Sequence, residues 1–231
     1  MVNSCTINFM NGGRKMNELH SSQQKEIQQA QFFYECAMKE CETKFQILFS
    51  ELLMKNERSS IQGVSSRVKT STSIYKKCER KGISISLDDI LSNVFDGAGV
   101  RVICSYIDDV YRIREMFLGQ DDVVLVNEKD FIKHPKTNGY RSLHLIVQLP
   151  VFLSNMKKNV VVEVQLRTAA MDFWASLEHE LKYKSDNKDP ALINELRICS
   201  DKAHLLDDEM MGLRDRIIAF NQQLEYAKKR H

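Results

Sequence analysis

Two segments in which apolar and polar side chains alternate constrain the fold of this chain more than any other feature. Residues 140–147 separate Arg141, Leu143, Leu145 and Val147 from Tyr140, Ser142, His144 and Ile146. Residues 160–167 read VVVEVQLR and separate Val160, Val162, Val164 and Leu166 from Val161, Glu163, Gln165 and Arg167. Successive side chains of a strand point to opposite faces, so this period of two predicts two β-strands, each with an apolar face toward a core.

The residues around these strands predict how they pair. Pro135 lacks a backbone donor and Asn138-Gly139 readily adopts positive φ, so a turn should precede a strand that starts at Tyr140. A loop containing Pro150 then allows antiparallel pairing, which would bring the two polar faces together. A phenol, an imidazole, a carboxylate, an amide and a guanidinium on one surface suit ligand binding, although the solvated face of an ordinary sheet looks the same.

Helical patterns flank these strands on both sides. Apolar residues recur at helical spacing over 25–55 and again over 191–227, after Asp189-Pro190. A short helix or turn is expected at 87–94, and helices are expected after a cap at Asp108 and at 171–184, with further strands at 100–106 and 123–126. The expected fold class is therefore α/β or α+β, with a mixed, mostly antiparallel sheet flanked by helices and long helices at both ends.

Composition sets the size and setting of the molecule. A chain of 231 residues that is 43% hydrophobic can bury the core of one domain with appended helices, and a net charge of +2 argues neither for nor against nucleic acid. The six cysteines show no zinc-ligand spacing, which favours reduced thiols. With no apolar run of about 20 residues and no signal-peptide core, the expected location is the cytoplasm rather than a membrane. Residues 1–24 are expected to form a mobile extension.

A basic segment, residues 65–82, is the first candidate binding element. Every charged side chain in it except Glu79 is basic, and a short helix should start at Thr70, Ser71 or Thr72 and end at Gly82. On that helix Ser73, Lys77 and Lys81 recur every four residues, beside a row formed by Lys76 and Arg80. Cations at a helix start suit a polyphosphate, but a solvated basic helix or an RNA contact fits the segment equally well.

Two acidic positions invite a chemical interpretation. Asp96 precedes Gly97 and Gly99 at the mouth of the 100–106 strand, where a carboxylate can hold a divalent ion or simply accept hydrogen bonds from turn amides. Glu178 and His179 lie on the predicted 171–184 helix, where a structural role is the better interpretation.

The motifs together resemble a known family. Arg67-x-Lys69, Ser73 with Lys77 and Arg80, D96GAGVR101, N138GYRSLH144, E163VQLRT168 and M171DFWASLEH179 are similar, in content and order, to the small alarmone synthetases. These are the single-domain relatives of the RelA/SpoT-type (p)ppGpp synthetases. The resemblance covers roughly residues 30 to 225, and several long motifs in the right order make a chance match improbable.

The resemblance implies a pyrophosphokinase with a nucleotidyltransferase-like synthetase domain over 25–185. It would transfer the β,γ-diphosphate of ATP to the 3′-hydroxyl of GDP or GTP and release AMP, with Mg²⁺ as cofactor. Residues 186–231 would form a helical region for oligomerisation, since family members are typically homotetramers regulated by an alarmone or RNA.

The resemblance also implies individual roles. Arg67 and Arg101 would flank adenine, and the ATP phosphates would contact Lys69, Ser73, Lys77 and Arg80. Asp96 and Glu163 would be the catalytic pair that holds the metal, with Glu163 also accepting the proton of the 3′-hydroxyl. The guanosine nucleotide would contact Lys136, Asn138, Tyr140, His144 and Gln165, with Tyr140 stacked on the base.

Some features depart from the family pattern, and other functions compete. Gly97 stands where many relatives carry an aliphatic residue, and His134 and Thr137 replace the usual Asn and Pro of the turn. The chain lacks the His-Asp dipeptide of the hydrolase domain, so synthesis without hydrolysis is expected.

The competing hypotheses are an RNA-binding module, which would not need Asp96 and Glu163, and a nucleotidyltransferase with other substrates. The preference between GDP, GTP and GMP stays open.

Overall fold

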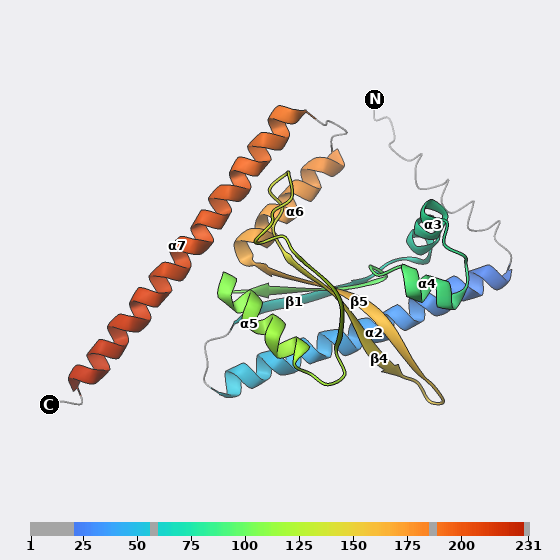
Figure 1. Cartoon of the computed structure of the whole chain (residues 1–231), viewed down its shortest axis with the longest axis horizontal. Helices are drawn as coiled ribbons and strands as arrows, with labels where there is room; N and C mark the ends of the chain where they lie inside the picture. The colour runs from blue at the N-terminus through green and yellow to red at the C-terminus, as the bar shows by residue number, and fades with distance from the viewer. Residues whose placement is uncertain (1–20, 56–59, 185–188, 229–231) are drawn as a thin grey trace, which may run out of the picture.

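The centre of the molecule is a five-stranded sheet, seen in a computed structural model that describes residues 21–55, 60–184 and 189–228 (Figure 1). Its strands stand in the order β1-β2-β5-β4-β3. Their bounds are β1 Ile61–Val68, β2 Ala98–Cys104, β3 Val124–Asp130, β4 Leu143–Phe152 and β5 Lys157–Thr168. Within the described residues β2 and β5 pair parallel and the other neighbours pair antiparallel, so the mixed, mostly antiparallel sheet is confirmed.

Six helices accompany the sheet in the described part of the chain. Their bounds are α2 Ser21–Met54, α3 Ser71–Lys81, α4 Leu87–Asn93, α5 Ile107–Leu118, α6 Ala169–Lys184 and α7 Pro190–Lys228. The basic helix α3 begins and ends as predicted, because the Thr70 side chain accepts a hydrogen bond from the Ser73 amide and Gly82 follows with φ of 64°. The expectation for residues 1–24 falls almost wholly on residues 1–20, which lie outside the described ranges.

Three sequence expectations need correction. The strand β1 was not predicted, and its second half was interpreted only as part of the basic segment 65–82. The strand β4 begins at Leu143 rather than Tyr140, since the buried Ser142 side chain donates to the backbone oxygen of Leu166 at 3.2 Å, beside the start of the ladder. Asp108 does not cap α5: the capping position is Tyr106, without a side-chain cap, and Asp108 lies in the first turn. There its negative charge still interacts favourably with the positive, N-terminal end of the helix dipole.

One face of the sheet packs against helices to form the hydrophobic core. Figure 1 shows α2 running beneath the strands, and the apolar stripe of α2 is buried as predicted, from Ile27 to Leu52. Phe45 of α2 stacks on Phe117 of α5 with ring centroids 4.3 Å apart, which joins the two helices over this face. Every second residue of β2 and β4 is buried here, so the alternate residues project from the opposite face.

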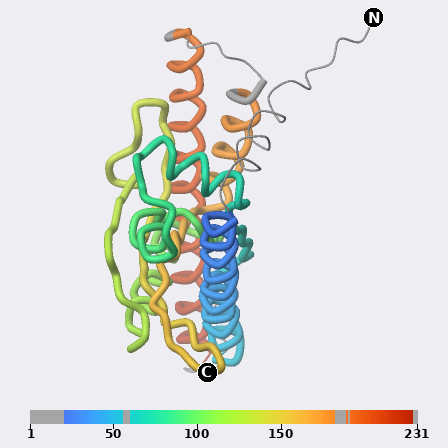
Figure 2. The backbone as a smooth tube through the Cα atoms, turned by 90° about the vertical axis from the view of Figure 1, so that its right-hand side faces the viewer, coloured from blue at the N-terminus to red at the C-terminus, as the bar shows by residue number. Residues whose placement is uncertain are grey.

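The last helix, α7, lies along the side of the molecule (Figures 1 and 2). Its first half packs on α6, where the Trp174 indole donates to the Leu196 oxygen at 2.9 Å. Arg214 then pairs with Asp108 of α5 at 2.8 Å. Nowhere in the described residues does a helix have both the length and the hydrophobicity needed to cross a membrane.

Candidate active site

The register of the sheet brings the polar positions of β2, β4 and β5 onto one face. Across the parallel β2 and β5 pair, Gly99 stands opposite Glu163 and Arg101 opposite Gln165. Across the antiparallel β4 and β5 pair, His144 stands opposite Gln165. The pairing predicted from alternation is confirmed, and Glu163 shares a face with His144.

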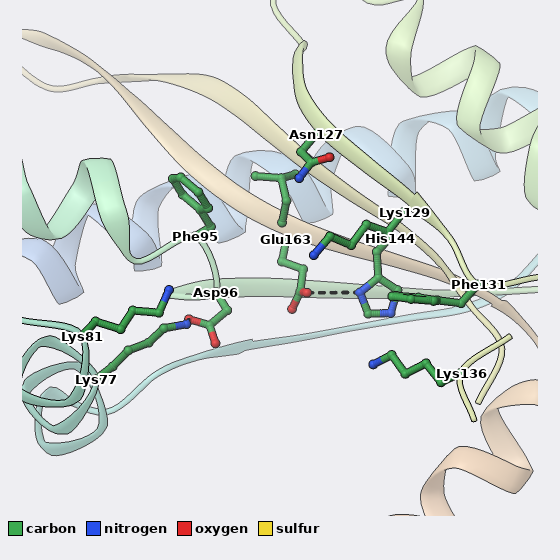
Figure 3. A pocket seen from close by; sticks show the side chains of 11 residues that line it. Lys77, Lys81, Phe95, Asp96, Asn127, Lys129, Phe131, Lys136, His144 and Glu163 are labelled. Carbon is green, nitrogen blue, oxygen red and sulfur yellow. Dashed lines mark hydrogen bonds and ion pairs between the residues drawn. The ribbon is translucent and has the colours of Figure 1, made fainter. Parts of the chain in front are cut away.

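A pocket of about 300 Å³ opens on this face (Figure 3). Figure 3 shows Asp96 beside Lys77 at one end, Lys136 at the other, and Glu163 between them. The full lining is Lys77, Lys81, Phe95, Asp96, Asn127, Lys129, Phe131, Lys136, His144, Ile146 and Glu163. Four lysines and two carboxylates around one cavity suit an anion bound together with a cation.

Asp96 is held at the mouth of β2 by two lysines. One carboxylate oxygen accepts from Lys69 at 2.9 Å and the other from Lys77 at 2.5 Å. Burial opposes ionisation of Asp96, but these hydrogen bonds outweigh it and hold the pKa of Asp96 below its usual value. The carboxylate is therefore ionised at neutral pH and already lies among cations.

Glu163 belongs to a chain of hydrogen bonds that crosses β5 and β4. Arg167 donates to the Tyr140 hydroxyl at 2.5 Å, and that hydroxyl lies 2.7 Å from Nε2 of His144. Nδ1 of His144 lies 3.2 Å from Glu163, and Gln165 donates to the other oxygen of Glu163 at 3.1 Å. All four contacts are satisfied when Tyr140 donates to Nε2 and the Nδ1 proton of His144 donates to Glu163.

The charge state of Glu163 follows from these partners. Burial disfavours the ionised form, but the hydrogen bonds from His144 and Gln165 lower the pKa of Glu163 below its ordinary value. The nearby negative charge of Asp96 acts in the opposite direction. Two carboxylates close enough to repel each other favour a shared cation between them.

The predicted ATP residues divide between the pocket and its surroundings. In the ladder between β1 and β2, Arg67 stands opposite Gly99 and Arg101 stands opposite Ser65. Both arginines therefore project from the same sheet face, on neighbouring strands and two ladder positions apart. The Arg101 guanidinium lies 3.1 Å from the Asp172 carboxylate. Burial is the main cause that lowers the pKa of Arg101, and the positive charge of Arg167 lowers it further. Ser73 and Arg80 lie on α3 outside the pocket lining.

The 136–140 turn carries most of the predicted guanosine contacts. The Lys136 ammonium lies 4.5 Å from the centre of the Tyr140 ring and 4.6 Å from that of Phe131. Asn138 donates to Glu178 of α6 at 2.9 Å, which supports the structural role expected for Glu178. Gly139 has φ of 91°, so the positive φ predicted for Asn138-Gly139 falls on the glycine.

Sequence reasoning missed the pocket residues of β3. Lys129 stands opposite His144 and Asn127 opposite Ile146, so both share the polar face. The available signal was the strand at 123–126, but the structure extends it to Asp130. Because Lys129 lies beyond the predicted end, its face could not be assigned.

The residues present are compatible with a magnesium ion. In the described part of the chain no cluster of three or more histidine, cysteine or acidic side chains forms a cage for a metal. Asp96 and Glu163 nevertheless line one pocket, and Mg²⁺ is commonly held by one or two carboxylates together with substrate phosphates.

Comparison with known proteins agrees with this geometry. The family model described as the region found in RelA and SpoT proteins matches residues 66–188. GTP pyrophosphokinase YwaC of Bacillus subtilis is 42% identical over 185 residues, which are 80% of this chain and 88% of that protein. GTP pyrophosphokinase YjbM of the same organism is 34% identical over 185 residues, 80% of this chain and 86% of its own.

Solved structures agree as well. The crystal structure of small alarmone synthetase 2 from Bacillus subtilis has a TM-score of 0.74 at 40% identity, and covers 82% of this chain and 98% of its own. That of small alarmone synthetase 1 from the same organism, bound to its product pppGpp, has a TM-score of 0.72 at 36% identity over 80% of this chain and 94% of its own. The chain therefore belongs to the RelA/SpoT family and, within it, to the small alarmone synthetases.

Proposed function

We propose that the chain is a GTP diphosphokinase that transfers the β,γ-diphosphate of ATP to the 3′-hydroxyl of GDP or GTP. The 3′-oxygen attacks the β-phosphorus, the bond from this phosphorus to the oxygen bridging it to the α-phosphorus breaks, and AMP leaves with that oxygen. The product is ppGpp or pppGpp. The observation that carries the proposal is one pocket in which Asp96 and Glu163 lie among Lys77, Lys81 and Lys136.

ATP is proposed to bind at the end of the pocket formed by β1, β2 and α3. Arg67 and Arg101 would enclose the adenine, because two guanidinium planes two residues apart on one sheet face can stack on a base. Lys69, Ser73, Lys77 and Arg80 would contact the phosphates. Lys69 and Lys77 are already positioned by their ion pairs with Asp96, so their ammonium groups are available next to the proposed polyphosphate site.

The guanosine nucleotide is proposed to bind at the other end. Tyr140 would stack on the base, and Lys136, Asn138, His144 and Gln165 would contact the nucleotide. Lys129 is added to this set because its strand position directs it to the same face as His144. These side chains come from the 136–140 turn, β3, β4 and β5, opposite the proposed ATP end (Figure 3).

Asp96 and Glu163 would hold Mg²⁺, which would neutralise the negative charge that develops on the transferred phosphates. Glu163 would also accept the proton of the 3′-hydroxyl. Its lowered pKa keeps it ionised at neutral pH, and the contact with His144 fixes the direction of its carboxylate.

A substitution at Glu163 tests the proposal. The expected result for Glu163→Gln is loss of (p)ppGpp formation with nucleotide binding largely retained, because the amide keeps the shape but cannot accept the proton. Purified protein is incubated with Mg²⁺, labelled ATP and GDP, GTP or GMP, products are separated by chromatography, and binding is measured by calorimetry. Near-normal AMP release by Glu163→Gln would refute the role of Glu163, and no product from the parent chain would refute the reaction.

The setting of this activity is proposed from the family. The chain would act in the cytoplasm as a homo-oligomer, a tetramer by resemblance, in which an alarmone or RNA could act as an allosteric ligand. The support within the chain is α7, whose outer side exposes many large apolar residues, among them Leu205 and Phe220 at 60% each.

A further inference from the structure

The 136–140 turn rests on the C-terminal helix as well as on the sheet. Ser200 of α7 is 4% exposed, and its hydroxyl donates to the Gly139 backbone oxygen at 2.5 Å. A β-carbon at Gly139 would lie 2.7 Å from Cβ of Ser200 and 3.1 Å from Cα of Arg197. The backbone of Gly139 therefore packs directly on α7, and both its positive φ and this close approach require glycine.

A second contact secures the chain on the far side of Tyr140. The Arg141 guanidinium donates to Asp201 of α7 at 2.9 Å, and its side chain is only 12% exposed. Ser200 and Asp201 are consecutive on α7, while Gly139 and Arg141 flank Tyr140. The two contacts thus hold the chain on both sides of this residue.

The carbonyl that Ser200 holds has a direct geometric link to Tyr140. The Gly139 oxygen and the Tyr140 nitrogen belong to the same planar peptide unit, so holding the oxygen fixes the plane from which the Tyr140 side chain departs. Inside the turn, the Gly139 amide donates to the Lys136 oxygen at 2.8 Å and the Tyr140 amide to the Asn138 side chain at 3.3 Å. The hydrogen bond from Ser200 ties this internal network to α7, and the Asn138 side chain ties it separately to Glu178 of α6.

We propose that Ser200 of α7 is a positioning residue for the guanosine nucleotide, acting through the Gly139 carbonyl on Tyr140 and assisted by Asp201 through Arg141. The proposal rests on the function proposed above, because it takes Tyr140 as the group that stacks on guanine. It gives the first half of α7 a role in substrate recognition as well as in packing. A helix expected to join subunits would then also hold the guanosine site.

The test compares the two substrates in the full chain. Ser200→Ala should raise the KM for GTP about 3- to 10-fold, the range for one lost hydrogen bond, with kcat and the KM for ATP within about twofold of the parent. Cys199→Ala is the matched control, because Cys199 precedes Ser200 on α7 and is exposed, and it should leave all three constants unchanged. Asp201→Asn should also raise the KM for GTP, and because this side chain is only half-buried and the substitution is nearly isosteric, the variant should keep the fold.

Amide hydrogen exchange gives a readout that needs no activity. Ser200→Ala should speed exchange of the Gly139 and Tyr140 amides, with exchange in β2 unchanged. Equal rises in both KM values, or an unchanged KM for GTP with unchanged exchange, would overturn the positioning role. A parent chain that forms no product contradicts the proposed reaction instead, and the exchange comparison then still decides whether Ser200 holds the turn.

Discussion

At the scale of single residues, the placement of Asp96 depends on a close fit between Gly97 and Tyr34. A β-carbon at Gly97 would lie 2.3 Å from Cζ of the Tyr34 ring, so glycine is required here by lack of space and not by a positive φ. Tyr34 is fully buried, and its hydroxyl donates to the Val94 oxygen at 2.8 Å. Gly97 therefore makes room for a ring that packs against the loop carrying Asp96.

This fit predicts a contrast between two glycine substitutions. Gly97→Ala should lower the free energy of unfolding by about 1–3 kcal/mol, the usual cost of overpacking a core. Gly99→Ala should have little effect, because the nearest atoms to a β-carbon there lie 3.9 Å away. Urea unfolding followed by circular dichroism measures both. Equal stability of the two variants would contradict the role given to the Tyr34 ring.

At the scale of elements, a buried carboxyl joins α7 to the end of β5. Asp207 is 8% exposed and accepts from the Thr168 hydroxyl at 2.6 Å, while the same Thr168 oxygen accepts from the Met171 amide at the start of α6. Burial raises the pKa of Asp207 above its ordinary value of 3.8, and Asp208 adds to this, although the Thr168 hydrogen bond and His204 act against it. The junction of three elements thus contains a carboxylate whose ionisation disfavours the folded state.

The sign of this shift predicts a pH dependence. Because the folded pKa is raised, ionisation of Asp207 removes stability as pH rises through that pKa, and costs nothing well below the ordinary value. The stability of Asp207→Asn relative to the parent should therefore improve from acidic to neutral pH. Thermal unfolding across this range measures the difference. A difference that does not change with pH would show that the charge of Asp207 is not opposed by its surroundings.

At the scale of the whole molecule, the position of α7 leaves an apolar surface uncovered. Its second half carries Leu213, Ile217 and Phe220, which are 41%, 52% and 60% exposed. Surfaces of this kind commonly mark contacts between proteins. Other residues of the same helix contact Gly139 and Asp108, so an assembly formed through α7 would be linked to the 136–140 turn.

This surface predicts the effect of added charge on assembly. Ile217→Glu combined with Phe220→Glu should reduce the molar mass in solution, because burying carboxylates in a subunit contact is unfavourable. Size-exclusion chromatography with light scattering measures the mass of parent and variant. Asn221→Glu, at an exposed polar position next to Phe220, is the control for added charge. A parent that is already monomeric, or a variant with the parental mass, would contradict the proposed assembly.

The sequence by itself determined the features that depend on local pattern. The period of two in residues 140–147 and 160–167 specified which side chains share a face, and that is why Glu163 and His144 could be placed together. The helical stripe of α2, the cap at Thr70 and the stop at Gly82 followed from residue types near each other in the chain. The order of the motifs was sufficient to indicate the family.

Tertiary structure alone decided the features that depend on distant contacts. Ser200 meets Gly139 across 61 positions, and Tyr34 meets the Val94 carbonyl across 60. Neither contact leaves a periodic signal, because it is made by one side chain reaching one backbone group. The strand β1 escaped prediction for a related reason: it lies at the sheet edge, where pairing on one side only relaxes the demand for apolar residues. Lys129 joined the pocket only because the ladder with β4 extends the strand to Asp130, and ladder length is set by the partner strand.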